Sequence, residues 1–165
     1  MSPPPPPRAG GEAHRVTQGL VPEVPRVAAV RAALLSAALF CVIAAFHAAL
    51  VLGARWGEFT QGGGTSGSLT ATGRIVAAVS CALSLIMAMA ILGRVGRGPL
   101  RRRSSRLKTA LAWFTTVYAA LAVVLNLITR STSERNLWAP VSILLLALVT
   151  FVMTTTHQGN VERGE

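Results

Sequence analysis

Five side chains in this sequence combine chemical capability with an unusual setting. They are one histidine, two glutamates, one asparagine and one arginine: His47, Glu58, Asn126, Glu134 and Arg135. Imidazole and carboxylate groups can act as acids and bases, and all five side chains can hydrogen-bond a polar ligand. The chain around them is strongly apolar, since 52% of its 165 residues are hydrophobic and only 13% are charged. Such a composition indicates a membrane protein.

The number and type of these residues argue against a metal or catalytic site. A metal ion needs three or four converging ligands, and His47 and Glu58 with one further acidic or thiol group do not reach that standard. No serine stands in a nucleophile elbow. Cys41 and Cys81 lie in apolar segments where nothing activates a thiol. Phosphate-loop and dinucleotide fingerprints are absent from the sequence. We therefore expect no catalytic residue, no metal and no cofactor.

Long apolar segments must position these side chains. There are four of them, at residues 32–53, 75–93, 109–129 and 137–156. Crossing roughly 30 Å of hydrocarbon takes about 20 apolar residues, and a backbone in lipid must bond within its own helix. Small residues at four-residue spacing, such as Ala33 and Ala37, let helices pack closely. The sequence predicts an all-α membrane protein, with a four-transmembrane-helix bundle over residues 27–156.

The tails and loops indicate an orientation. Residues 1–26 hold a five-proline run and few apolar residues, so we expect a disordered tail. A second tail is expected at residues 157–165. Counting Arg31 with the first tail, 12 of the 16 Lys and Arg fall in the two tails or in the 94–108 loop. The positive-inside rule then predicts a multi-pass protein of the cell membrane with both termini in the cytoplasm.

Basic residues are densest in the loop between the second and third segments. The group comprises Arg101, Arg102, Arg103, Arg106 and Lys108. Aromatic residues that would stack on bases are not interleaved with it. Despite the net charge of +10 we therefore expect no nucleic-acid partner. Basic residues beside a span attract anionic lipid headgroups. The expected partners are the lipid bilayer and those headgroups, and a homo-oligomer or a membrane partner protein stays open.

The five polar side chains fall at the opposite end of the expected bundle. With a helical rise of about 1.5 Å per residue, His47 lies roughly 9 Å and Asn126 roughly 4.5 Å below the outer ends of their segments. Polar groups at such depth usually turn inward and pair. We expect the five to converge in an outer polar cluster, in which Glu58 or Glu134 faces Arg135 or His47. The cluster would either only stabilise the bundle or bind a small ligand.

The first outer loop is rich in glycine. Its turn residues are Gly53, Gly57, Gly62 and Gly63. Glycine permits the positive φ angles of tight turns. We therefore expect residues 56–63 to form an ordered turn, as part of a short outer cap.

The second outer loop carries a helix-start signal. Ser131 and Glu134 have capping-box spacing, which predicts that the fourth helix begins near Thr132. Pro140 would fall inside that helix, where it lacks an N–H. We expect a kink near Asn136, or a short outer helix followed by the span.

These two outer segments resemble a family of small bacterial four-helix integral membrane proteins. The first reads His47 … Gly53-x-x-x-Gly57-Glu58 … Gly62-Gly63, followed by Arg74, and the second reads Asn126 … Ser131-x-x-Glu134-Arg135 … Pro140. The likeness covers most of residues 35–155. Relatives often have proline at the position of Arg55 and a Leu-Pro turn before Arg74, which Gly/Ser/Thr sequence replaces here. The resemblance implies the four-helix topology and no particular activity.

The leading expectation is a non-enzymatic membrane protein, either an accessory subunit or a small-ligand-binding protein. A small oligomeric transporter is one alternative, although transporters are usually built from repeats and residues 27–93 and 107–156 show no convincing repeat. A membrane-embedded enzyme that uses His47 and Glu58 in an outward-facing site is another.

Overall fold

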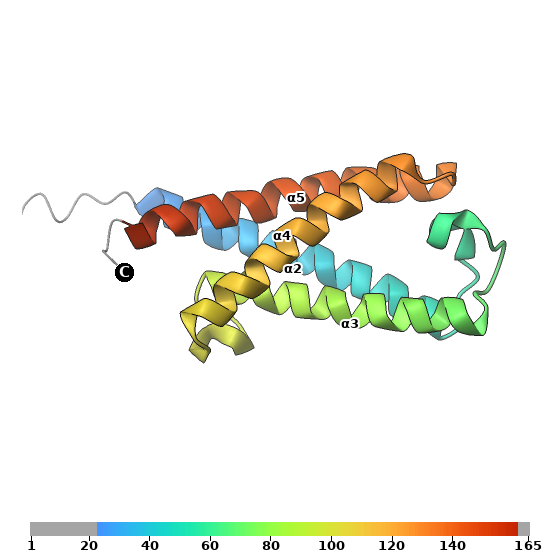
Figure 1. The fold of residues 1–165 in the computed structure, drawn as a ribbon, viewed down its shortest axis with the longest axis horizontal. Coiled ribbons are helices and arrows are strands. Elements are labelled where there is room, and N and C mark those ends of the chain that lie inside the picture. The colour runs from blue at the N-terminus through green and yellow to red at the C-terminus, as the bar shows by residue number, and fades with distance from the viewer. Residues whose placement is uncertain (1–22, 162–165) are drawn as a thin grey trace, which may run out of the picture.

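The structure, a computed structural model, describes the backbone of residues 23–161 and the side chains of residues 26–156. Its α-helices are α2 (Glu23–Val51), α3 (Ala71–Arg94), α4 (Ser105–Ile128) and α5 (Thr132–Val161), shown in Figure 1. Short 3-10 turns are η1 (Gly57–Phe59), η2 (Gln61–Gly63) and η3 (Pro99–Arg102). Over these residues the fold is all-helical and contains no strand, which confirms the predicted fold class.

Each of the four helices is long and apolar enough to cross a membrane. The candidate spans are Arg26–Val51, Ala71–Arg94, Ser105–Ile128 and Thr132–Thr156. The helices begin four or more residues before the predicted apolar segments, and polar N-caps set the starts of α3, α4 and α5. Thr70 Oγ1 accepts a hydrogen bond from Gly73 N, and Ser104 Oγ accepts one from Leu107 N. The apolar run marks the membrane-sized core of a helix, whereas the cap marks its end.

Helix ends also shift the boundaries expected for the tails. The expected disordered tail ended at residue 26, but α2 already begins at Glu23. The expected second tail began at residue 157, but α5 continues to Val161. The rest of both tails lies outside the described residues.

The four helices form two hairpins that cross each other. α2 packs along α3, and α4 packs along α5. In Figure 1, α4 runs diagonally from beside α3, at the end that carries η3, to beside α5 at the other end. There the hairpins separate, and the loop with η1 and η2 stands in the gap. We call this the cap end, and the end with η3 the basic end.

The hydrophobic core fills mainly the middle and the basic half of the bundle. One cluster joins all four helices and includes Phe40 from α2, Met87 and Ile91 from α3, and Val149 from α5. A smaller cluster of Leu50, Leu69 and Ala77 belongs only to the α2–α3 side of the cap end. The packed core therefore does not extend between the two hairpins at the cap end.

Small residues allow α2 to approach the other helices of the bundle closely, as their spacing indicated. Ala33 and Ala37 are both buried against the core. Ser36 is also fully buried, and its hydroxyl donates to Ala32 O at 2.8 Å. A buried hydroxyl needs a partner, and the carbonyl of its own helix supplies one without reaching across the interface.

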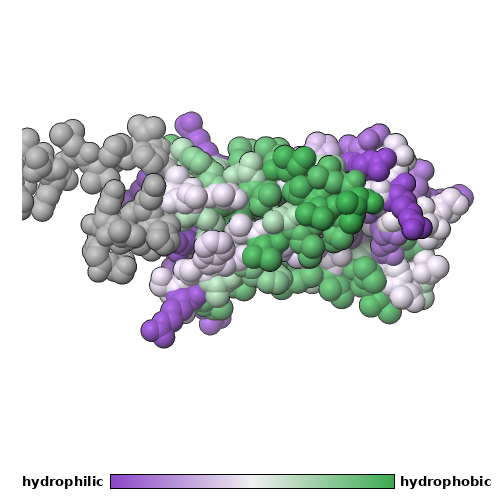
Figure 2. Space-filling view, turned by 45° about the horizontal axis from the view of Figure 1, so that its top comes forward, coloured by the Kyte–Doolittle hydropathy of each residue, from purple (hydrophilic) through white to green (hydrophobic). Residues whose placement is uncertain are grey.

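The molecular surface is apolar in the middle and polar at its ends. Figure 2 shows hydrophobic side chains across the middle of the visible face and hydrophilic ones towards both ends. Large apolar side chains such as Val42, Val117 and Leu144 are at least half exposed. A continuous band of exposed apolar side chains suits a lipid environment.

Pro140 lies inside a helix that continues past it. α5 runs unbroken from Thr132 to Val161. The expected division into a short outer helix and a separate span is therefore wrong. Proline removes one N–H and one helical bond, and the helical turns on either side continue the helix.

Candidate functional site

The turn between α4 and α5 is built around Ser131 and Glu134. Glu134 N donates to Ser131 Oγ at 3.1 Å, so Ser131 caps α5 as its spacing predicted. The reciprocal half of the capping box is not formed. Instead, Glu134 Oε2 accepts hydrogen bonds from Thr129 Oγ1 and from the backbone N of Gly62, each at 2.8 Å. The side chain thus joins the α4–α5 turn to the glycine-rich loop.

Two further hydrogen bonds join the same segments. Ser131 Oγ donates to the carbonyl of Glu58 at 2.8 Å. Trp138 Nε1 donates to the carbonyl of Phe59 at 2.7 Å. Together with the bond between Gly62 and Glu134, they connect residues 58–62 to the start of α5. We call residues 56–63 the cap.

Two glycines are needed for this cap to close. A Cβ on Gly57 would lie 2.5 Å from Thr65 O, because the loop folds back on itself there. Gly63 has φ +69°, and a Cβ on it would lie 2.5 Å from Ser131 Cβ. Gly53 and Gly62 also have positive φ angles. The turn expected at residues 56–63 is therefore present.

Aromatic rings join the cap to α2 and α5. The Phe46 ring stacks on Trp56 with centroids 5.9 Å apart, and it meets Trp138 edge-on at 4.8 Å. Offset-stacked and edge-to-face pairs stabilise a contact beyond its buried area. Phe46 belongs to α2 and Trp138 to α5, so this contact joins the two hairpins as the cap hydrogen bonds do.

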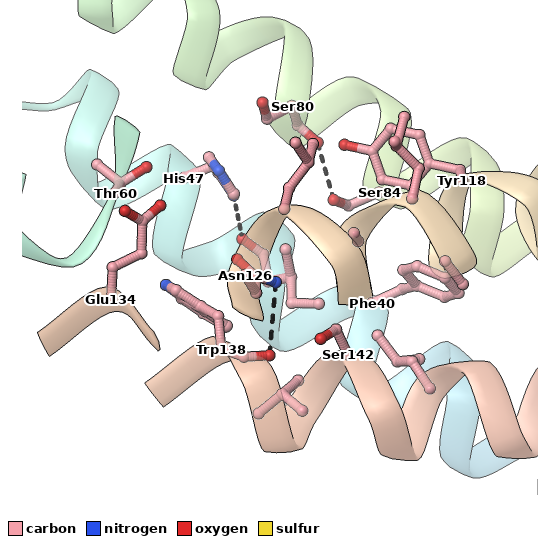
Figure 3. A pocket seen from close by; sticks show the side chains of 17 residues that line it. Phe40, His47, Thr60, Ser80, Ser84, Tyr118, Asn126, Glu134, Trp138 and Ser142 are labelled. Atoms are coloured by element: carbon pink, nitrogen blue, oxygen red, sulfur yellow. Dashed lines mark hydrogen bonds between the residues drawn. The ribbon is translucent and has the colours of Figure 1, made fainter. Parts of the chain in front are cut away.

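A cavity of about 260 Å³ lies between the hairpins below the cap. Its wall draws on all four helices and on the cap: Phe40, Ile43, His47, Thr60, Ser80, Ser84, Tyr118, Ala119, Leu121, Ala122, Leu125, Asn126, Glu134, Trp138, Val141, Ser142 and Leu145. Figure 3 shows Glu134, Thr60 and His47 towards one end, and Phe40 and Tyr118 towards the other. The cavity therefore has a polar end near the cap and a mostly apolar body.

His47 and Asn126 reach the cavity wall, but each bonds a backbone carbonyl. His47 Nδ1 lies 2.9 Å from Ile43 O in its own helix. Asn126 Nδ2 donates to Trp138 O over 3.5 Å, from α4 to α5. The second distance is at the limit of a hydrogen bond. Neither side chain forms a strong hydrogen bond between helices.

The five predicted cluster residues are only partly brought together. His47, Asn126 and Glu134 line one cavity. Glu58 joins the cap through its carbonyl while its side chain is exposed, and Arg135 Nη1 donates to Thr129 O at 3.0 Å. The expected pairing of a glutamate with Arg135 or His47 is not found among residues 26–156. Backbone and hydroxyl donors take the place of the cation at Glu134.

The predicted lipid-headgroup residues lie at the basic end. Arg101 and Arg102 belong to η3, and Arg103, Arg106 and Lys108 follow it. All are exposed except Lys108, which is half-buried. Arg94 lies at the same end of α3 and donates to Thr109 Oγ1 at 3.1 Å.

Several residues of the site were not identified as such from the sequence. Trp138 donates to the cap and lines the cavity. Gln61 has φ +53° and donates to Gly73 O at 2.8 Å, which fixes the cap to α3. Thr60 is buried at the roof of the cavity. Their roles depend on contacts between distant segments, and only the glycine spacing marked this stretch as ordered.

Comparisons with protein-family models, with curated proteins and with solved structures find no match to this chain.

Proposed function

We propose that this protein is a small non-enzymatic membrane protein that binds a small ligand between its helices. The cavity of about 260 Å³ below the cap carries this proposal. Its volume is close to the lower end of ligand pockets, roughly 300 Å³. A mostly apolar wall with a few polar groups gathered at one end is typical of small-molecule sites. Well-packed interiors contain few voids larger than a water molecule.

The polar end of the cavity favours binding over catalysis. Glu134 Oε2 is held by two donors, and His47 Nδ1 is engaged by a carbonyl of its own helix. A catalytic acid or base normally lies within hydrogen-bonding reach of its orienting partner and of the reacting group. The hydrogen-bond partners of both side chains belong to the helices and the cap, which suits fixed recognition of a polar group.

The proposal includes a setting in the cell membrane. The four helices would cross the bilayer with both termini in the cytoplasm, because the basic end carries most of the positive charge. The exposed guanidinium groups of Arg101, Arg102 and Arg103 would meet anionic lipid headgroups there. The cap end would face outward.

The cap supports membership of the small four-helix family that the sequence resembles. The two segments that carry the resemblance are joined by three hydrogen bonds, from Gly62 N, Ser131 Oγ and Trp138 Nε1. Residues from distant parts of the chain thus form one structural unit. The closing of the cap accounts for the two motifs without a catalytic role.

Native mass spectrometry of the protein from its own membranes tests the proposal. Ala122 on α4 is half-buried and lines the cavity, whereas Ala120 on the same helix is exposed. The wild type and Ala120→Phe should retain a small molecule in mild detergent, and Ala122→Phe should lose it because the ring fills the space. An absence of any bound molecule in the wild type, together with a more stable Ala122→Phe variant, would indicate a simple packing void.

A further inference from the structure

Two hydrogen-bond acceptors, one on His47 and one on Glu134, lie at the polar end of the cavity, near the Thr60 hydroxyl (Figure 3). Because a carbonyl only accepts, His47 Nδ1 must donate to Ile43 O, which leaves Nε2 of the neutral ring as an acceptor. Both hydrogen bonds that the Glu134 carboxylate accepts are to Oε2, and Oε1 has no hydrogen-bond partner among residues 26–156. Glu134 also forms no ion pair with the described residues. This end of the cavity therefore offers a carboxylate and an imidazole lone pair.

The body of the cavity offers little polarity in comparison. Ser84 Oγ donates to Ser80 O at 2.8 Å, and Ser142 Oγ donates to Ala139 O at 2.9 Å. These hydroxyl protons are directed to their own helices. Ser80 and Tyr118 add two further hydroxyls, and the other residues around them are apolar. An alkyl chain would suit this part of the wall.

Access to the cavity is open on the side of the bundle rather than at its end. The cap covers the cap end, with Thr60 buried in the roof. Leu121 and Leu125 on α4 line the cavity, yet they are 52% and 53% exposed. Figure 1 shows α4 diverging from α3 in this half of the molecule. In a bilayer this side faces hydrocarbon, so a ligand would arrive dissolved in lipid.

From these observations we infer the ligand class: a single-chain amphiphile with a primary ammonium head, bound with the head at Glu134 and His47 and the chain along Val141 and Leu145. The ammonium group supplies both the missing positive charge and N–H donors, and charge-assisted hydrogen bonds are about twice as strong as neutral ones. A cavity of about 260 Å³ holds roughly nine water volumes of about 30 Å³. That space suits one short chain and is too small for a two-chain lipid. The inference rests on the ligand-binding function proposed above.

The test uses the full chain in nanodiscs of zwitterionic lipid, with Trp56→Phe and Trp113→Phe so that Trp138 is the remaining tryptophan. Decylamine, decanol and decanoate share a chain and differ in the head. Titration of Trp138 fluorescence should give decylamine about tenfold tighter binding than decanol, the gain expected from one charge-assisted bond. Decanoate should bind most weakly, because Glu134 repels it.

Two glutamine variants test which carboxylate causes the preference for decylamine. Glu134→Gln keeps an acceptor for Gly62 N and Thr129 Oγ1 but removes the charge, so decylamine should lose about tenfold in affinity. Glu58→Gln removes an exposed carboxylate at the same end that does not line the cavity, and it should change nothing. Equal or tighter binding of decanol or decanoate, or an unchanged preference in Glu134→Gln, overturns the inference.

The outcomes also distinguish a failure of this ligand class from a failure of the proposed ligand-binding function. If none of the three amphiphiles binds while native mass spectrometry still detects a molecule lost in Ala122→Phe, the ligand class is wrong and the binding function stands. If neither measurement detects a ligand, both fall.

Discussion

Glu134 Oε2 accepts a hydrogen bond from the backbone N of Gly62 over 2.8 Å, although 72 residues separate the two in sequence. Gly62 belongs to the loop that joins α2 to α3, and Glu134 lies in the first turn of α5, in the other hairpin. At the cap end the buried core does not extend between the two hairpins, and this contact joins them together with the ring contact of Phe46 and Trp138. The cap and the cavity therefore depend on each other.

Gly63→Ala should destabilise the protein, whereas Gly64→Ala should not. At Gly63 the φ angle is +69° and an added Cβ would overlap Ser131; at Gly64 the φ angle is −70° and the space is open. We expect a loss of about 1–3 kcal/mol in the free energy of unfolding for Gly63→Ala and within about 0.5 kcal/mol for Gly64→Ala. Unfolding in mixed detergent micelles measures both. Equal stability of the two variants would show that the cap is not closed as described.

Trp138 should contribute through its N–H and through its ring. Trp138→Phe removes the bond to Phe59 O and should cost about 1 kcal/mol. Trp138→Ala also removes the ring contact with Phe46, worth a further 0.5–1.5 kcal/mol or so before the loss of buried area. Trp113→Phe is the matched control, since Trp113 is 55% exposed. The prediction fails if Trp138→Phe is as stable as the wild type in the same micelle titration.

His47→Ala and Asn126→Ala should reduce ligand retention more than stability. An interhelical hydrogen bond in a membrane is worth about 0.6–2 kcal/mol, but His47 bonds its own helix and the Asn126 contact is 3.5 Å long. We expect each variant to lose less than about 0.6 kcal/mol on that scale. Native mass spectrometry and micelle unfolding would be run on the same samples. A loss near 2 kcal/mol with the bound molecule retained would support a purely structural role.

Single cysteines test the orientation. Gly64→Cys and Arg102→Cys, each with Cys41 and Cys81 replaced by alanine, place one thiol at the cap end and one at the basic end. Both positions are exposed, and Arg102 avoids the capping serine at position 104. In intact cells an impermeant thiol reagent should label position 64 and not position 102. The reverse pattern would place the basic end outside.

The amino-acid sequence predicts the helices well, because the backbone of each apolar segment must form its hydrogen bonds within its own helix. The four spans follow from length and hydropathy alone, and the start of α5 follows from Ser131 three residues before Glu134. The glycine positions indicated an ordered turn. Each of these inferences depends on neighbours within a few residues along the chain.

The site is harder to predict because its contacts join distant segments. The expected partner of Glu134 was a cation, but Oε2 of its carboxylate instead accepts hydrogen bonds from Thr129 Oγ1 and from the backbone N–H of Gly62. The bond from Trp138 to Phe59 spans 79 residues. The cavity arises from the angle at which the hairpins cross, and no local residue pattern specifies that angle.

Photo-crosslinking with residue-level mapping tests the central claim, that a ligand occupies the cavity below the cap. Decylamine and decanol, each carrying a diazirine on the chain, would be irradiated with the protein in nanodiscs. Val141 and Leu145 line the cavity, whereas Ile143 and Leu144 on the same helix are 49% and 50% exposed on the outside. Labelling should fall on Val141 and Leu145 with at least one probe and should disappear there in Ala122→Phe. Labelling confined to Ile143, Leu144 and other outward side chains with both probes would contradict the account.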